Sequence, residues 1–189
     1  MSKTYTSAWS SQAGRWWKRF CSPDKGDPAV RARLRRCRDR VDTAMIPQAL
    51  ILGRMLVPDA GADVDGEQFG TALDLARVLA HVKTDDVRPP MRSVGWERFP
   101  TGGDEERPPL SELRFKRLLQ ATEGEGRVDA FIRLIALMDA TANVAEIAES
   151  FRWWGHPDGR AQKRWAFEYY NAADFTSEPV TAPSTVESD

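Results

Sequence analysis

Nearly every patterned segment of this sequence repeats its apolar residues every three to four positions, and helix-breaking residues fall between the segments. In "EQFGTALDLARVLAHVK", for example, Phe69, Leu73 and Ala76 lie on one side of a helix. A strand would instead alternate apolar and polar side chains with a period of two. The pattern therefore predicts an all-α protein.

The breakers divide the predicted helices into two small helical bundles. The N-terminal bundle, residues 8–83, is expected to contain helices over about 8–20, through the arginine-rich stretch after Asp27, near 46–56, and through the segment just quoted. Asp27 is the expected N-cap of the arginine-rich helix, and Pro28 suits its first position. Residues 84–109 carry two "RPP" triplets and a "TGG" with few apolar anchors, so we expect a long, mobile connection there.

The C-terminal bundle is expected over residues 110–173. Ser111 and Asn143 are expected N-caps, and Pro157 is expected at the start of the last helix. The three helices after "LSELRFKRLLQ" are predicted at about 127–140, 143–154 and 157–173, with "GEGR" as a helix-breaking turn. Residues 174–189 contain four acidic residues and no Lys or Arg, and this composition predicts a disordered acidic tail.

The net charge of −1 hides an uneven distribution of charge. Residues 1–40 hold 11 basic and 3 acidic side chains, and six of the basic ones are arginines in "AVRARLRRCRDR". On a continuous helix, Val30, Leu34, Cys37 and Val41 form one core-facing stripe. All the arginines lie off that stripe: Arg31, Arg35 and Arg38 along one flank, and Arg33, Arg36 and Arg40 on the back. Such a run is often only a solvated helix face, but mutual repulsion among six like charges favours an anionic partner.

Two further amphipathic segments combine an apolar side with basic residues: Arg114, Lys116 and Arg117 in "LRFKRLLQ", and Arg160, Lys163 and Arg164 in "GRAQKRWAFEYY". Arginine suits phosphate because its planar fork donates two parallel hydrogen bonds. Without a strand platform, such a surface is expected to contact a nucleic-acid backbone rather than base edges. A helix-turn-helix protein is the nearest rival, but the arginine-rich helix offers no Asn or Gln to read bases.

Catalytic and metal-binding patterns are missing from the sequence. His81 and His156 lie near neither a cysteine nor each other at metal spacing, and no phosphate-binding glycine loop or HExxH is present. We therefore expect no enzyme, no cofactor and no metal. Cys21 and Cys37 alone form no disulfide framework, and neither a signal peptide nor a membrane-spanning stretch is evident, so a cytoplasmic location is expected.

The tryptophans could serve either as stacking platforms for bases or as core residues. Five of them stand at helical spacing beside leucine, isoleucine and phenylalanine: Trp16, Trp17, Trp153, Trp154 and Trp165. This setting favours the core.

In order along the chain, "GDPAVRARLRRCRD", "IPQALILGRML", "LARVLAHVK", "LSELRFKRLLQA", "NVAEIAESFRWWG" and "KRWAFEYY" resemble one known family. It is the small subunit of the type I-E CRISPR surveillance complex Cascade, the CasB family, and the resemblance covers about residues 14–173. It implies an all-α, non-catalytic subunit of an antiviral RNA-guided complex, present in two copies that contact the backbone and large subunits.

The resemblance also implies that basic surfaces hold crRNA-bound target DNA and so stabilise the R-loop. Arg35, Arg36, Arg114 and Arg117 match basic positions of the family pattern, as do Arg160, Lys163 and Arg164. The turn "GHPDGRAQ" is longer than the family pattern before the last basic helix. The alternative is a protein-interaction scaffold whose arginines dock on acidic partner subunits. In neither case do we expect a membrane or a small-molecule substrate as partner.

Overall fold

The computed structural model describes residues 7–58, 66–95 and 108–170. Within these ranges the chain forms helices joined by short connections, together with one pair of two-residue strands, which confirms the all-α prediction. The elements are α1 (Ala8–Phe20), α2 (Pro28–Leu34), α3 (Arg40–Ala44), α4 (Pro47–Leu56), α5 (Glu67–Leu79), β1 (Thr84–Asp85), α6 (Pro90–Val94), α7 (Glu112–Gln120), α8 (Gly124–Leu137), β2 (Thr141–Ala142), α9 (Val144–Trp153) and α10 (Arg160–Tyr169). No helix in the described ranges is long and apolar enough to cross a membrane.

The predicted N-caps account for several helix starts. The Asp27 carboxylate accepts hydrogen bonds from the backbone N–H groups of Ala29 and Val30, and Pro28 opens α2 as expected. Asn143 likewise caps α9 by accepting from the N–H of Glu146 at 2.9 Å. Ser111 occupies the N-cap position of α7 without making a side-chain hydrogen bond.

The arginine-rich stretch is not one continuous helix, which corrects the single stripe expected from its sequence. α2 ends at Leu34, and a second helix, α3, begins after Asp39, whose carboxylate accepts from the N–H of Asp42 at 2.8 Å. Val30 and Leu34 are buried as predicted, but Val41 is 74% exposed. The internal cap at Asp39 competes with helix continuation, and the break rotates Val41 away from the core.

Part of the expected connection over 84–109 has structure. β1 pairs in parallel with β2, with Thr84 opposite Thr141, and thereby ties the chain after α5 to the turn between α8 and α9. The short helix α6 follows and buries Met91 and Val94. Residues 96–107 and the predicted acidic tail from residue 174 lie outside the described residues.

The C-terminal helices begin at different residues from those expected. α8 starts at Gly124, so "GEGR" forms its first turn, where Gly124 takes a φ of 55°. α10 begins only at Arg160, after Gly159 in the left-handed conformation with φ 61°, and Pro157 lies in the turn before it. The Pro157 prediction was therefore wrong, because the left-handed glycine sets the start of the helix.

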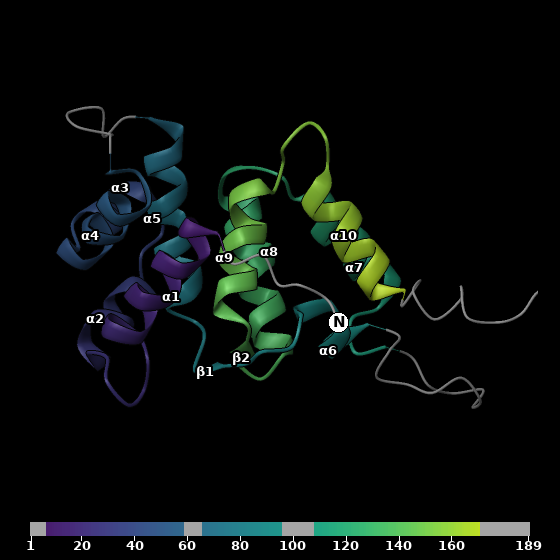
Figure 1. The fold of residues 1–189 in the computed structure, drawn as a ribbon, viewed down its shortest axis with the longest axis horizontal. Coiled ribbons are helices and arrows are strands. Elements are labelled where there is room, and N and C mark those ends of the chain that lie inside the picture. Colours follow the sequence, from purple (N-terminus) through teal and green to yellow (C-terminus); the bar gives the residue numbers. More distant parts are fainter. Residues whose placement is uncertain (1–6, 59–65, 96–107, 171–189) are drawn as a thin grey trace, which may run out of the picture.

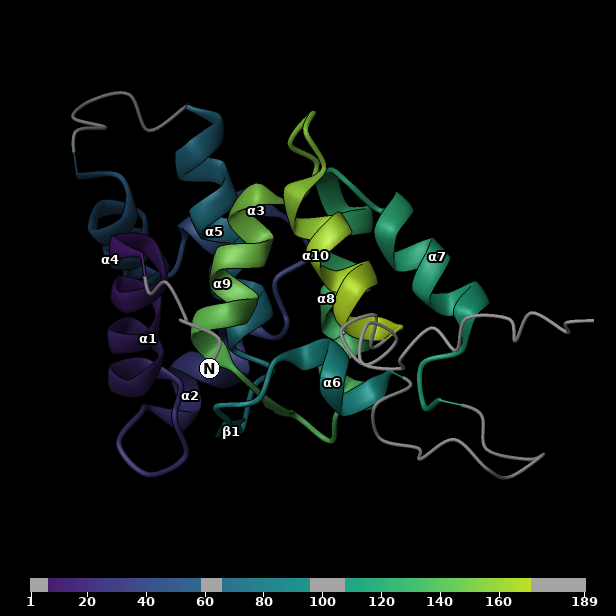
Figure 2. The ribbon, with the colours of Figure 1, turned by 45° about the vertical axis from the view of Figure 1, so that its right-hand side comes forward.

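The two halves of the chain share one hydrophobic core, and a division into two bundles is not confirmed. Helices α1–α5 lie on one side of the molecule, α6, α7 and α10 on the other, and α8 and α9 between them (Figures 1 and 2). α1, the first helix, packs against α4 and also against α9, where the indole of Trp9 donates to the carbonyl of Ala148 at 3.2 Å.

The tryptophans belong to that core. Four of the five singled out from the sequence are buried, Trp16, Trp17, Trp154 and Trp165, and Trp153 is half-buried. Three indoles donate to backbone carbonyls: Trp16 to Gln48, Trp17 to Val82 and Trp154 to Ala121. These contacts confirm the core interpretation.

Candidate nucleic-acid interface

The first basic patch consists of exposed arginines at the end of α2. Arg35 and Arg36 occupy the turn after α2, and neither has an ion pair with any described residue. Arg31 is half-buried and donates from Nε to the carbonyl of Ala80 at 3.0 Å. Arg38 is exposed but donates to the carboxylate of Asp42 at 3.0 Å. Arg33, on the last turn of α2, is likewise exposed and has no ion pair with a described residue, so the run contains three such arginines.

A pocket of about 310 Å³ lies beside this patch. It is lined by Arg35, His81 and Lys83 and, across from them, by Ile135 and Ala136 of α8. Burial, with Arg35, Arg31 and Arg77 nearby, lowers the pKa of His81 to about 4. His81 is therefore neutral at pH 7. Arg35 and Lys83 give the pocket positive charge, and Asp139, which also lines it, offsets part of that charge.

The second basic patch lies on α7. Arg114 and Arg117 are exposed and have no ion pair with a described residue, and together with Arg133 of α8 they line a groove of about 570 Å³ between α7 and α8. Lys116 is also exposed but lies on another side of α7, where it lines a smaller pocket beside α10. The groove therefore brings together Arg114 and Arg117 with Arg133, which no sequence pattern marks.

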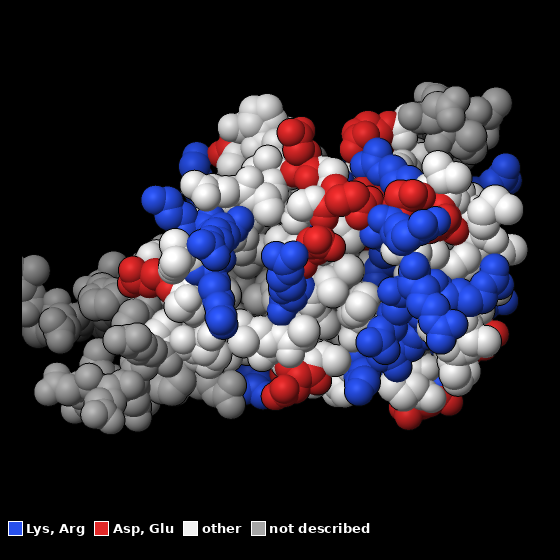
Figure 3. Space-filling view, turned by 180° about the vertical axis from the view of Figure 1, so that it is seen from behind, with Lys and Arg blue, Asp and Glu red and all other residues white. Residues whose placement is uncertain are grey.

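The helix α8 connects the two patches. Arg133 and Leu134 border the α7 groove, and the next two residues, Ile135 and Ala136, border the pocket that contains Arg35. On the face of the molecule opposite to that of Figure 1, basic side chains form a large group at one end, a smaller group at the other, and an isolated group between them (Figure 3). Phosphates spaced along a strand could contact both ends of such a surface.

The third predicted group, on α10, has a different environment. Arg160 pairs with Asp158 at 2.7 Å and stacks over the ring of Trp153 at 4.4 Å. Arg164 donates from Nη2 to Glu146 and to the hydroxyl of Ser150, the latter at 2.9 Å. Lys163 is exposed without an ion pair to a described residue. Both arginines of this group already have anionic partners within the protein.

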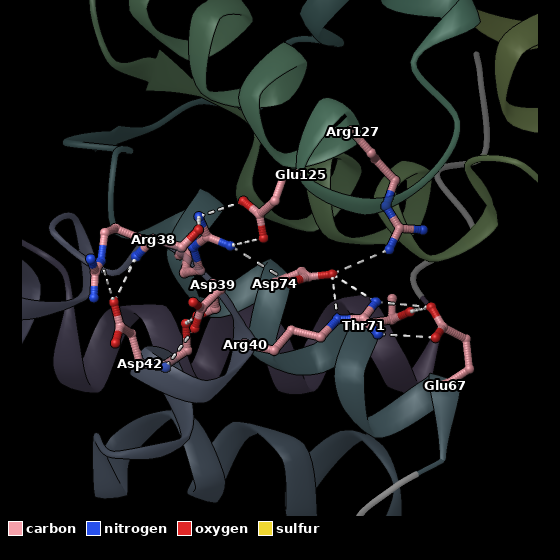
Figure 4. Close-up of polar contacts among 11 residues, drawn as sticks. Arg38, Asp39, Arg40, Asp42, Glu67, Thr71, Asp74, Glu125 and Arg127 are labelled. Atoms are coloured by element: carbon pink, nitrogen blue, oxygen red, sulfur yellow. Dashed lines mark hydrogen bonds and ion pairs between the residues drawn. The ribbon is translucent and has the colours of Figure 1, made fainter.

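A buried ionic cluster joins α3, α5 and α8 (Figure 4). At its centre Asp74, only 1% exposed, accepts from Nε of Arg40 at 3.0 Å. Arg127 approaches the same carboxylate at 3.5 Å, and Arg77 lies 3.9 Å from its second oxygen. The three guanidinium groups surround a single buried carboxylate.

Two further carboxylates, on the rim of this cluster, balance its charge. Arg77 donates from Nη1 and Nη2 to Glu125, at 2.8 Å each, and Arg40 forms a two-pronged pair with Glu67 at 3.0 and 2.9 Å. The bond to Arg40 lowers the pKa of Glu67, whereas burial lowers the pKa of Arg127 despite the attraction of Asp74. Arg40 belongs to the arginine run, so one arginine of that run forms ion pairs within the protein instead of facing an external partner.

The histidines stand apart from any metal-like arrangement. Within the described ranges, no group of three or more His, Cys, Asp or Glu side chains is placed to hold a metal ion. His156 lies 2.8 Å from the carboxylate of Asp158 in the turn before α10. The polar chemistry of the described surface is therefore that of arginine, lysine and their carboxylate partners.

The fold and this surface define a class: an all-α protein with exposed arginines, several of which have no ion pair with a described residue. The model of one family, CRISPR-associated protein Cse2, matches residues 30–170. The match spans most of the sequence, and the chain therefore belongs to the Cse2 family, the CasB family of type I-E CRISPR Cascade, which confirms the resemblance drawn from the sequence. No curated protein and no solved structure matches the chain.

Proposed function

We propose that this protein is a non-catalytic subunit of type I-E Cascade that binds the phosphate backbone of crRNA and target DNA and so stabilises the R-loop. Membership of the Cse2 family supports the assignment to Cascade. The observation that carries the nucleic-acid role is two patches of exposed arginines without an ion pair to a described residue, Arg35 with Arg36 and Arg114 with Arg117. Arg35 lines a pocket beside α8, and Arg114 and Arg117 line the groove between α7 and α8.

The unpaired state of these arginines matters energetically. A guanidinium that already pairs with a carboxylate must give up that partner to bind phosphate, whereas an exposed, solvated one need not. Arg133 and Lys83 join the proposed surface, because they line the same groove and pocket. The other basic residues selected from the sequence line neither the groove nor the pocket, and their role in nucleic-acid binding stays a prediction. They are Arg31, Arg38, Lys116, Arg160, Lys163 and Arg164.

A second function, docking on protein partners, is supported by a different surface. Val41 and Met45 of the α3 region are each 74% exposed, and Leu50 and Ile51 of α4 add two further exposed apolar side chains. Scattered exposed apolar residues are ordinary, but four on adjacent helices suit a protein contact. We propose that Cascade backbone and large subunits, and a second copy of this chain, contact such surfaces.

Salt titration separates the two functions. Phosphate contacts lower the logarithm of the binding constant linearly with the logarithm of salt concentration, by about 0.7 per contact for single strands and 0.9 for duplexes. We expect the isolated protein to bind both single- and double-stranded DNA with several such contacts. The variant Arg15→Ala with Arg54→Ala is a matched control, because both residues are exposed and line neither the groove nor the pocket.

The control should leave the salt dependence nearly unchanged. A wild-type protein without measurable DNA binding at low salt would contradict the nucleic-acid role and favour the docking scaffold. Copurification of the tagged chain with the products of its own operon, followed by identification of the bound RNA and proteins, tests membership of the complex independently of DNA binding.

A further inference from the structure

The groove between α7 and α8 has two kinds of lining. Its apolar side chains come from both helices and their ends: Leu110, Leu118, Ala121, Ala130, Leu134 and Leu137. Its charged side chains are Arg114, Arg117 and Arg133, and none of the described residues that line it is acidic. With a volume of about 570 Å³, the groove is large enough for several side chains of a peptide segment.

The three arginines at this groove are poorly neutralised. Arg114 and Arg117 lie three residues apart on α7 and have no ion pair with a described residue. Arg133 pairs only with the exposed Asp129, at 3.5 Å, among the described residues. Like charges at this spacing repel one another unless an anion lies across them. A phosphate backbone would supply the anion, but it would leave the apolar lining uncovered.

A segment that carries both carboxylates and apolar side chains fits the groove better, and this chain contains one. Residues 171–189, which lie outside the described residues, have four acidic residues and no Lys or Arg. Each of their three largest apolar residues stands within two positions of an acid: Phe175 beside Asp174, Val180 after Glu178, and Val186 before Glu187. The segment thus has apolar residues next to acidic ones, and the groove has apolar residues next to arginines, so the two are complementary.

The point where this segment begins is close to α7. Tyr170, the last described residue, makes an edge-on ring contact with Phe115 of α7, with centroids 6.2 Å apart. Phe115 follows Arg114 directly in the sequence. Nineteen residues span at most about 60 Å when fully extended, which is ample to reach the other side of one helix.

We propose that the acidic C-terminal segment, residues 171–189, docks in the groove between α7 and α8. Its apolar side chains contact the leucines and alanines of the lining, and its carboxylates pair with Arg114, Arg117 and Arg133. Docked there, the segment covers one of the two arginine patches and competes with nucleic acid for it. The competition rests on the proposed function, whereas the docking does not.

Phe175→Ser in the full chain tests the docking without changing any charge. The aromatic ring of a docked Phe175 shifts the NMR signals of nearby methyl groups, so selective labelling of leucine methyls reports on Leu118, Leu134 and Leu137. We expect these signals to move in Phe175→Ser. Phe167→Ser is the matched control, because Phe167 is an exposed phenylalanine on α10 that does not line the groove, and it should leave them in place.

The outcomes separate the possible occupants. Groove leucine signals that do not respond to Phe175→Ser would refute the proposal. A response that disappears on tenfold dilution would show that the segment of a second copy fills the groove, which overturns the intramolecular form. A response that persists on dilution supports docking within one chain.

The effect on nucleic acid is measured separately. A tethered segment acts at an effective concentration of the order of millimolar, so its removal from the groove should tighten binding of single-stranded DNA about 2- to 10-fold at low salt. If the acidic segment only repelled DNA at long range, Phe175→Ser would not change the affinity for DNA, because it keeps the charge of the segment. Docking without any DNA binding would contradict the proposed function alone, and tight DNA binding with an empty groove would contradict the docking alone.

Discussion

The arginines at the junction of α3, α5 and α8 and the arginines on the exposed face differ in what neutralises them. Arg40, Arg77 and Arg127 lie around the buried carboxylate of Asp74, with Glu67 and Glu125 at the rim. Arg35, Arg36, Arg114 and Arg117 have no ion pair with a described residue. The same side chain therefore joins helices in one region and stays available to an external anion in the other.

The difference follows from the cost of burying charge. A guanidinium removed from water needs a carboxylate within reach, and a lone buried charge is strongly destabilising. The helix α5 supplies that carboxylate in its middle at Asp74, and the first turns of α8 bring Arg127 to Asp74 and Glu125 to Arg77. On the exposed turn after α2 and on α7, water solvates the arginines, so no internal partner is required.

Of the substitutions proposed, removal of the central carboxylate should lower the free energy of unfolding most. Asp74→Ala leaves Arg40, Arg77 and Arg127 around a site that no longer carries a compensating charge. Loss of one partner from a buried ionic group typically costs about 3–5 kcal/mol, so we expect the free energy of unfolding to fall by that amount. Urea denaturation followed by circular dichroism measures it.

Asp129→Ala is the matched control for that measurement. Its ion pair with Arg133 also links residues of opposite charge, but both side chains are exposed, and we expect a change within about 0.5 kcal/mol. Equal losses in the two variants would mean that burial does not distinguish the interior arginines from the surface ones.

Replacement of the surface arginines should leave stability almost unchanged and weaken DNA binding. Arg35→Ala with Arg36→Ala, and Arg114→Ala with Arg117→Ala, each remove two proposed phosphate contacts. Each pair should therefore reduce the salt slope by about 1.4 for single strands. The quadruple variant should lose the sum if one strand contacts both patches. Binding isotherms across a salt series, with unfolding curves for the same proteins, decide this.

Two results would contradict the proposal that both arginine patches bind the same strand. An unchanged slope in the Arg35 and Arg36 variant, with an intact fold, would assign that turn to protein docking or solubility. A quadruple variant no weaker than the weaker double variant would indicate that the two patches do not bind the same strand. Binding should fall about equally for all DNA sequences, since backbone contacts carry no base information.

The sequence predicts the helices far better than it predicts the partners of charged residues. Periodicity and caps predict α1, α4, α5 and the starts of α2 and α9, because these depend on residues close in the chain. The break at Asp39 was missed, although a second capping residue inside the arginine run was visible. The strand at residues 84–85 depends on pairing with β2, more than 50 positions away, and α6 packs against the still more distant α10, neither of which periodicity registers.

The surface arginines were selected from charge runs, amphipathic patterns and a family resemblance, and none of these separates them from the interior ones. Arg40 stands in the same run as Arg35 and Arg36, but its carboxylate partners lie on α5. Arg133 is a single basic residue in "AFIRLIAL", so no run marks it, and it joins the groove only because α8 packs beside α7. Contacts between distant segments decide the role of each arginine.

A smaller effect is expected from His81, whose lowered pKa should make stability depend on pH. Its pKa is lowered to about 4 by burial and by Arg35, Arg31 and Arg77, whereas the unfolded chain takes up the proton near its ordinary value of 6.5. Proton uptake thus favours unfolding, and stability should fall as the pH drops from about 6.5 toward 4. Melting temperatures between pH 7 and 4.5 measure the loss.

His81→Gln should flatten that dependence. The carboxylates with lowered pKa, such as Glu67 and Asp42, lose their contribution mainly below pH 4.5, so the range above it reports the histidine. An equally steep loss in the Gln variant would show that protonation of His81 does not cause the loss of stability.

We expect the smallest effect on DNA binding from Arg164. This residue tests whether an ion pair within the protein matters, because its side chain is exposed and yet paired. Its guanidinium contacts Glu146 and Ser150, so phosphate would have to displace both. We expect Arg164→Ala to cost at most about 1 kcal/mol of stability and to leave the salt slope unchanged. Lys163→Ala, on the same helix and without an ion pair to a described residue, serves as the matched variant. If Lys163→Ala lowers the slope and Arg164→Ala does not, α10 contacts nucleic acid through its unpaired cation alone. If both lower it by about 0.7, pairing within the protein does not protect an arginine from phosphate, and the distinction between paired and unpaired arginines fails at the surface.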